Sequence, residues 1–366
     1  MNYNFPVYKP SLKGNEKKYV DDCLDSTWIS SKGKYIKLFE DRFSEFVDIK
    51  YSIAVSNGTV ALHLALLALG IGEGDEVIVP TFTYIASVNA IKYAYAKPVF
   101  VDSHPQTWQI DPSEIREKIT KKTKAIMAVH IYGHPCDMNQ IKKIAKENNL
   151  YIIEDCAEAI GSYYDNKHAG SFSDIATFSF FGNKTITTGE GGMVCTNNKN
   201  LEEMVIRLKG QGLATGKEYF HDIIGYNYRM TNICAAIGFA QLERISDILK
   251  EKDRVIAEYK QALKNVPVHI HQEIGNVKHS YWMITILASS EKEKSNLRNY
   301  LSENGIETRP AFHPVHTMPM YVDVNAYPVA EDLGKRGINL PSYPDLSNDD
   351  IRFITSRIAA YFNVKK

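Results

Sequence analysis

Short apolar runs alternate with helix-like patterns through the first 245 residues. Runs of strand length, rich in Val, Ile and Phe, occupy residues 51–56, 75–80, 97–103, 124–133, 150–156, 174–181 and 191–197. Apolar residues at helical spacing occupy residues 59–70, 84–94 and 137–149. Strands that alternate with helices indicate βαβ units. The pattern therefore predicts an α/β fold with a mostly parallel central sheet and helices on both of its faces.

The pattern changes after about residue 245. Residues 244–266 form one long, highly charged segment that predicts a helix bridging to a smaller domain. A strand at 280–288 and helices at 291–305 and 349–362 are expected beyond it. We predict a large domain over residues 1–245, which includes an N-terminal segment, and a smaller C-terminal α/β domain over residues 246–366.

Composition and charge exclude several classes of function. Lys and Arg number 43, as do Asp and Glu, and no basic stripe interrupts this balance, so a nucleic-acid partner is not expected. No apolar run approaches 18 residues, so no membrane span is expected. The start of the chain lacks a signal-peptide pattern, and the five scattered cysteines do not suggest a disulfide framework. Together these features favour a cytoplasmic protein.

Several short motifs do not fit the chemistry they first suggest. The segment GNKT lacks the glycine spacing of a phosphate-binding P-loop, and GQGLATG misses the dinucleotide fingerprint. His130, His134 and Cys136 lie close together, but no second group of ligands completes a zinc site. We therefore expect no bound metal.

The segment from Ser56 to Thr59 lies between a predicted strand and a predicted helix. The first N–H groups of a helix have no partner within it, and the positive end of the helix dipole attracts anions. Gly58 would let a ligand approach the backbone closely. The segment is a candidate phosphate site, and an ordinary helix cap explains it equally well.

Asp155 ends an apolar strand, where open α/β sheets bind their ligands. Its carboxylate is a candidate partner for a protonated ring nitrogen. The alternative is an N-cap for a helix that would begin at Cys156.

Lys184 lies in SFFGNKTITTGEGG, a run of aromatic, hydroxyl and glycine residues in which Glu190 is the only other charge. A single lysine in a loop is usually solvated. A lysine amine in a pocket can instead form a Schiff base with a carbonyl. A phosphate site, an acid at a strand end and such a lysine together indicate pyridoxal 5′-phosphate (PLP).

The segments EDCAEAIG, FSFFGNKTITTGEGGMV and GYNYRMTNICAAIGFAQLE resemble those of the DegT/DnrJ/EryC1/StrS family of PLP-dependent sugar aminotransferases. The resemblance runs from residue 26 to residue 342. It implies an aspartate-aminotransferase-like fold (fold type I). Some relatives replace the lysine by histidine and act as dehydratases, so Lys184 favours transamination.

The resemblance also implies roles for individual residues. Lys184 would hold PLP covalently and move a proton during the reaction, while Asp155 would pair with the pyridine nitrogen. Glu158, one helical turn on, would lie near the hydroxyl edge of the ring. Further cofactor contacts are expected from Gly58, Thr59, Tyr84, Ser179, Asn183 and Asn227. Tyr84 would stack on the ring, although a core aromatic is its alternative. Asn227 would come from a neighbouring subunit, which implies a homodimer with shared sites.

The implied substrates are a nucleotide-linked 4-keto sugar and L-glutamate as amino donor. The resemblance places five residues in the sugar pocket: Ser30, Ser31, Arg309, His313 and His316. A structural turn rich in Pro and His is the alternative for the last three. The first alternative is an aminotransferase for another UDP- or dTDP-linked keto sugar. A non-catalytic PLP-binding regulator is a second alternative, and the retention of Lys184, Asp155 and Asn227 argues against it. A nucleotide-binding structural protein is a third, and the sequence lacks a phosphate motif of its own for that function.

Overall fold

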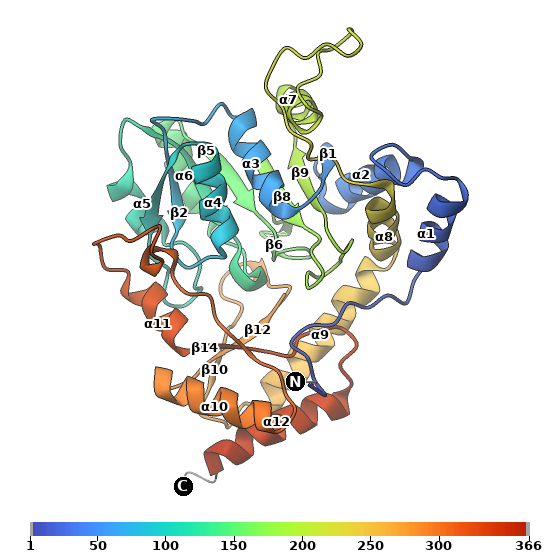
Figure 1. Ribbon diagram of the computed structural model, residues 1–366. Helices are drawn as coiled ribbons and strands as arrows, with labels where there is room; N and C mark the ends of the chain where they lie inside the picture. The colour runs from blue at the N-terminus through green and yellow to red at the C-terminus, as the bar shows by residue number, and fades with distance from the viewer. Residues whose placement is uncertain (1–2, 364–366) are drawn as a thin grey trace.

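The computed structural model describes residues 3–363, and a seven-stranded sheet forms the centre of its larger part (Figure 1). The strand order is β1-β9-β8-β5-β4-β2-β3, and neighbours from β8 to β3 are parallel, whereas β9 runs antiparallel to both β1 and β8. The strands are β1 Tyr51–Val55, β2 Glu76–Pro80, β3 Lys97–Val101, β4 Thr123–Val129, β5 Tyr151–Asp155, β8 Ile175–Ser179 and β9 Gly192–Thr196. The predicted mostly parallel sheet is confirmed.

Helices cover both faces of this sheet, and the strand residues alternate between the two layers. Ile153 of β5 packs in the core on one face, whereas Ile152 packs in a separate core on the other. The first face carries α3 Gly58–Ala68, α4 Ile85–Tyr93 and α7 Lys199–Lys209. The second carries α2 Lys34–Val47, α5 Pro112–Lys118, α6 Met138–Asn148 and α8 Asn232–Glu243, with α1 Glu16–Asp25 packed on α8.

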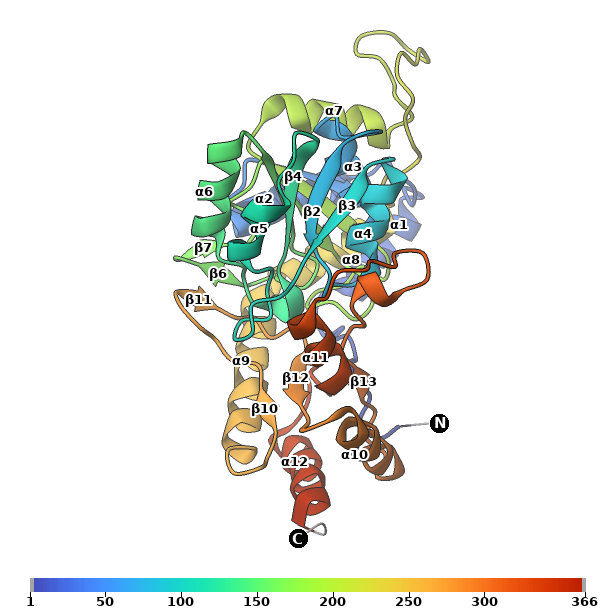
Figure 2. The same cartoon turned by 90° about the vertical axis from the view of Figure 1, so that its left-hand side faces the viewer.

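The helix α9 Ile245–Ala262 leads from the large sheet to a smaller antiparallel sheet (Figures 1 and 2). This sheet has the order β10 His269–Ile270, β12 Ile284–Leu287, β14 Gly337–Leu340 and β13 Arg309–Pro310. It is accompanied by α10 Glu291–Glu303, α11 Pro328–Arg336 and α12 Asn348–Asn363. Phe5 pairs with Ile306 here, so the start of the chain lies against the C-terminal part. The division into two domains at residues 245 and 246 remains a prediction.

Two local features differ from the sequence expectations. No helix follows Asp155, because the chain turns at 156–161 and enters a small sheet of β6 Tyr163–Tyr164, β7 Lys167–His168 and β11 Val277–Lys278. Glu158 therefore lies in a turn and not one helical turn on. The strand expected at 280–288 is regular only over β12, so residues 280–283 cross between the two parts of the molecule in irregular conformation.

A long loop projects from the body between α7 and α8 (Figures 1 and 2). We call residues 210–231 the projecting loop. Its tip is polar and aromatic, and Tyr219 and Ile224 are almost fully exposed. Within residues 3–363, no helix is both long and apolar enough to cross a membrane.

Candidate active site

A cavity of about 620 Å³ lies where strands of the large sheet end and the C-terminal part begins. Its walls come from the start of α3, the start of α4, the ends of β5 and β8, and the segments around Trp282 and Arg309. Nine of the residues singled out in the sequence line it: Gly58, Thr59, Tyr84, Asp155, Glu158, Ser179, Asn183, Lys184 and Arg309. Strand ends of an α/β sheet are the expected place for such a site.

Lys184 reaches this cavity from the turn that follows β8. Its N–H donates to the carbonyl of Phe181 over 2.9 Å, which closes the turn. Its side chain is only 11% exposed, and its Nζ lies 3.6 Å from Oε1 of Glu158. Burial lowers the pKa of Lys184 below its ordinary value, and the nearby carboxylates Glu158 and Asp155 partly oppose this. Lys184 is therefore a buried amine in the cavity wall and not a solvated loop lysine.

Asp155 is the last residue of β5, and it shares the α3–α4 face with Ile153, two residues earlier. Its Oδ2 accepts a hydrogen bond from Oγ of Ser87 at 2.7 Å, and its Oδ1 accepts one from the N–H of Ala157 at 3.1 Å. The second contact is a local turn, because no helix begins here. The helix-cap alternative is therefore wrong, and the carboxylate is held in place while it lines the cavity.

The start of α3 caps its helix and also lines the cavity. The side chain of Asn57 accepts from the N–H of Val60 at 3.0 Å, so the segment does cap the helix. The following residues, Gly58 and Thr59, nevertheless line the cavity. A Cβ on Gly58 would lie 2.8 Å from Cβ of Ser179, so glycine is required for the helix to approach the end of β8 this closely. The helix end and the hydroxyl of Ser179 together form a cradle suited to an anion.

Glu158 is buried, and its two oxygens have different partners. Oε2 accepts from the N–H of Tyr132 at 2.7 Å, while Oε1 faces the amine of Lys184. Burial raises the pKa of Glu158 to about 7, although the charge of Lys184 and the Tyr132 amide act in the opposite direction. Near neutral pH this carboxyl can therefore hold or release a proton beside the lysine.

Tyr84, Asn183 and Arg309 complete the predicted set that lines the cavity. Tyr84 is 56% exposed, so it is not a core aromatic, and its ring lies 5.7 Å from that of Phe312. The Oδ1 atom of Asn183 is buried and has no hydrogen-bond partner among the described residues. Such an atom is costly unless a ligand or water satisfies it.

Four residues assigned to the sugar pocket do not line this cavity: Ser30, Ser31, His313 and His316. The carbonyl of Ser30 accepts from the N–H of Asn232 at the start of α8. His313 is exposed on the surface. His316 is buried, with Nδ1 2.8 Å from Oγ1 of Thr81 and Nε2 3.7 Å from Glu331, so it connects the end of β2 to the C-terminal part.

Asn227 does not line the cavity of its own chain. It is exposed on the projecting loop, between Tyr226 and Tyr228, whose rings stack 4.9 Å apart. Both tyrosines pack near His63 of α3, with ring centroids 5.1 Å and 6.0 Å from it. Because side chains alternate along an extended segment, Asn227 points away from α3 of its own chain.

Sequence reasoning missed four residues that shape the site: Tyr8, Ser87, Tyr132 and Trp282. Ser87 orients Asp155, and Tyr132 orients Glu158 through its amide. Tyr8 and Trp282 hold the carbonyls of Lys184 and Asn183, each with a hydrogen bond of 2.7 Å. Residues this far apart in the sequence carry no local pattern that would connect them.

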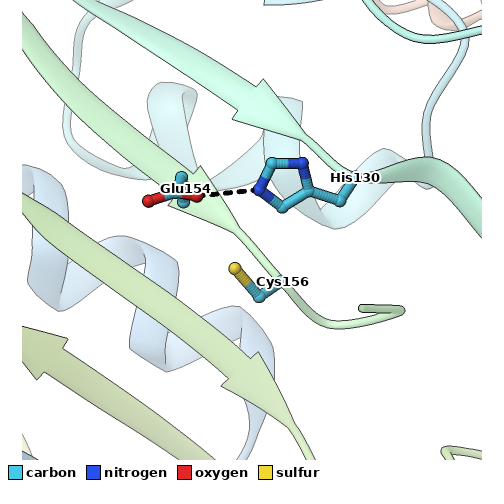
Figure 3. Close-up of side chains that lie close together, drawn as sticks. All are labelled: His130, Glu154 and Cys156. Carbon is cyan, nitrogen blue, oxygen red and sulfur yellow. Dashed lines mark hydrogen bonds and ion pairs between the residues drawn. The ribbon is translucent and has the colours of Figure 1, made fainter. Parts of the chain in front are cut away.

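A second group of polar side chains, His130, Glu154 and Cys156, lies buried on the opposite face of β5 (Figure 3). Nε2 of His130 lies 3.0 Å from Oε1 of Glu154, and Nδ1 of His130 accepts from the N–H of Cys136. The amides of Gly170 and Phe172 also donate to Glu154. These contacts satisfy the polar atoms of His130 and Glu154, so we interpret the two side chains as structural. Cys136 donates to the carbonyl of Val129 and is not part of it.

Comparison with known proteins identifies the family. The model of the DegT/DnrJ/EryC1/StrS aminotransferase family matches residues 10–359. The chain belongs to this family. It is 61% identical to a GDP-perosamine synthase of Escherichia coli O157:H7 over 98% of this chain and 99% of that one. It is 52% identical to a GDP-perosamine synthase of Vibrio cholerae, over 98% and 99% of the two chains.

This aminotransferase also resembles solved structures over its whole length. A sugar aminotransferase of Streptococcus pneumoniae, Spr1654 in its PLP form, superimposes with a TM-score of 0.94 at 27% identity and covers 99% of each chain. The expected aspartate-aminotransferase-like fold, fold type I, is thereby confirmed, and so is PLP as the cofactor.

Proposed function

We propose that this aminotransferase is a GDP-perosamine synthase, which transfers the amino group of L-glutamate to C4 of GDP-4-keto-6-deoxy-D-mannose. The observation that carries the substrate is the 61% identity with a GDP-perosamine synthase along nearly the entire chain. Segments 26–36 and 224–238 also resemble that enzyme. The product would serve the synthesis of O-antigen in bacterial lipopolysaccharide.

The residues of the cavity fit PLP. The start of α3 and Ser179 form an anion cradle, Asp155 offers a fixed carboxylate, and Lys184 offers a buried amine. The unpartnered Oδ1 of Asn183 is a further polar group that a ligand would satisfy. When bound, PLP supplies an electron sink for bonds at the amino-bearing carbon.

The protein residues supply position and protons. Asp155, fixed by Ser87, would keep a ring nitrogen protonated, because a charge pair about 4 Å apart at an effective dielectric near 20 is worth on the order of 4 kcal/mol before desolvation. Lys184 would take a proton from the substrate carbon and return it, since burial lowers its pKa and so favours the neutral amine. Glu158, whose pKa lies at about 7, would exchange that proton with the amine.

A homodimer with shared sites is part of this proposal. The side chain of Asn227 is exposed and points away from α3 of its own chain, and the projecting loop that carries it extends from the body (Figure 1). In a twofold dimer each contact occurs twice, so each cavity would receive Asn227 from its partner. Mixing Lys184→Ala and Asn227→Ala protomers should restore one complete site in each heterodimer. Heterodimers without activity would contradict the sharing.

We place the protein in the cytoplasm. Its five cysteines are free among the described residues, and four of them are buried, which fits a reducing compartment. Fractionation of the native host would test the location.

The substrate proposal is tested with matched 4-keto-6-deoxy sugars on GDP, UDP and dTDP, each incubated with purified protein, PLP and glutamate. Mass spectrometry of the products should show amination of GDP-4-keto-6-deoxy-D-mannose above the others. A clear preference for a UDP- or dTDP-linked sugar would overturn the substrate while leaving the aminotransferase intact. If glutamate did not change the colour of the bound cofactor, a non-catalytic PLP-binding regulator would be favoured.

A further inference from the structure

One aromatic residue of the cavity wall, Trp282, contacts the turn that carries Lys184 in two ways. The centroid of its ring lies 3.9 Å from Nζ of Lys184, which places the amine over the ring face. Its indole Nε1–H donates to the carbonyl of Asn183 at 2.7 Å. Trp282 therefore holds both the amine of the lysine and the backbone that precedes it.

Other residues of the protein hold Trp282 in place. It is 4% exposed, and its ring lies parallel to that of Tyr132 with centroids 6.4 Å apart. Its carbonyl accepts a hydrogen bond of 3.1 Å from Lys252, a buried lysine of α9 that also donates to the carbonyl of Ser342. The indole is thus held at a set position relative to Lys184 by the C-terminal part of the molecule.

The two protonation states of the amine interact differently with this ring. An ammonium ion is attracted to the negative face of an indole, whereas a neutral amine lacks that attraction. Burial of Lys184 acts in the opposite sense, because it disfavours the charged state. A lysine that takes and returns a proton must be able to adopt both the neutral and the protonated state during the reaction.

We propose that Trp282 is a positioning residue for catalysis, whose ring face stabilises the protonated amine of Lys184 against its burial. This inference rests on the proposed function of Lys184. The other charged groups that line the same cavity are Asp155, Glu158, Glu190 and Arg309. The carboxylate of Glu158 also favours the charged amine. Trp282 and Glu158 therefore both counteract the effect of burial, which favours the neutral amine.

The test measures the protonation midpoint of Lys184 in full-length, cofactor-free protein. Competitive labelling with acetic anhydride between pH 6 and pH 11, followed by peptide mass spectrometry, reports the reactive neutral fraction of this amine. We expect Trp282→Leu to lower the midpoint by about 0.4–1.5 pH units, which corresponds to the usual strength of a cation–π contact. Trp282→Phe keeps a weaker ring face and should give a smaller decrease.

The matched control is Trp108→Leu, because Trp108 is also a buried tryptophan but stacks on His271 and does not line the cavity. It should leave the midpoint unchanged. A midpoint that stays the same or rises in Trp282→Leu and Trp282→Phe, or an equal decrease in Trp108→Leu, would overturn the inference. If Trp282→Leu does not fold, the labelling midpoint of Trp282→Phe, which retains a buried ring, decides the test.

A separate experiment tests the proposed function of Lys184. Borohydride reduction of each PLP-loaded protein should fix the cofactor on Lys184. If it does not, the assignment of Lys184 fails whatever the labelling midpoints are. If it does and the midpoint does not fall, only the role of Trp282 is contradicted.

Discussion

Glu154 and Asp155 are neighbouring buried carboxylates of β5 that face opposite sides of the large sheet. Glu154 accepts a hydrogen bond from His130 (Figure 3) and two more from the amides of Gly170 and Phe172, all inside the protein. Asp155 accepts from Ser87 and Ala157 and also lines the cavity. The same strand thus carries one carboxylate whose partners are all internal and one that remains available to a ligand.

The difference shows how position within a strand separates structural from functional acids. Burial alone would raise the pKa of Glu154, but the hydrogen bond from His130, together with the amide of Gly170, lowers it overall. Glu158, in the turn after β5, has fewer donors, and burial raises its pKa to about 7. Glu154, which the fold satisfies, therefore stays charged, whereas Glu158, which faces the cavity, remains able to titrate near neutral pH.

The largest expected effect is that of Asp155→Asn. The amide keeps the size of the side chain and can still bond to Ser87 and Ala157, so the fold should survive. It cannot keep a ring nitrogen protonated, so turnover should fall more than about a hundredfold. Steady-state kinetics and circular dichroism of the same preparation measure the two outcomes. Near-normal turnover would make Asp155 a structural residue like Glu154.

Glu158 should produce a pH-dependent loss of stability in the cofactor-free protein. The folded state releases its proton at a pKa of about 7, above the ordinary value of 4.5, so the folded state binds more protons between these values. The free energy of unfolding should therefore fall as pH rises from 4.5 to above 7, by on the order of 3 kcal/mol. Urea unfolding at pH 5 and pH 8 should show this fall in the wild type and a smaller one in Glu158→Gln. Equal falls in both proteins would contradict the raised pKa.

Glu154→Gln should give the smallest effect, and on stability alone. The new NH₂ group meets donors from His130, Gly170 or Phe172, so at least one buried donor loses its acceptor. The cost should be about 1–3 kcal/mol in the free energy of unfolding. Turnover per folded molecule should stay close to the wild type. A large loss of turnover at unchanged stability would place Glu154 in the catalytic machinery.

The fold was predictable where strands and helices had a regular pattern. The strands of the large sheet are apolar runs that end at polar or turn residues, and both features can be read locally. No helix was predicted at α1, α2, α5, α7, α8 or α11. α8 is apolar around most of its circumference and packs between α1 and α2, so it shows no helical period. The turn at 156–161 was taken for a helix, since Asp155 resembles a cap when its tertiary contacts are unknown.

The site was predictable as far as its chemistry lies in compact motifs. Lys184, Asp155 and Gly58 each occur in a short segment whose residue types indicate a chemical role. Tyr8 and Trp282 lie 176 and 99 residues from the carbonyls they hold, so only folding brings them to the lysine. The residues of the sugar pocket could not be derived, because discrimination between sugars depends on hydrogen bonds whose partners come from several elements.

The most direct test of the account is to locate the lysine that holds PLP. Purified protein should be yellow when loaded, and borohydride reduction followed by proteolysis and mass spectrometry should place the cofactor on the peptide that contains Lys184. Lys184→Ala should lose this covalent label, although the helix cradle and Asp155 can still retain PLP noncovalently. A label on any other lysine, or an equal label in Lys184→Ala, would contradict the assignment of this cavity as the active site.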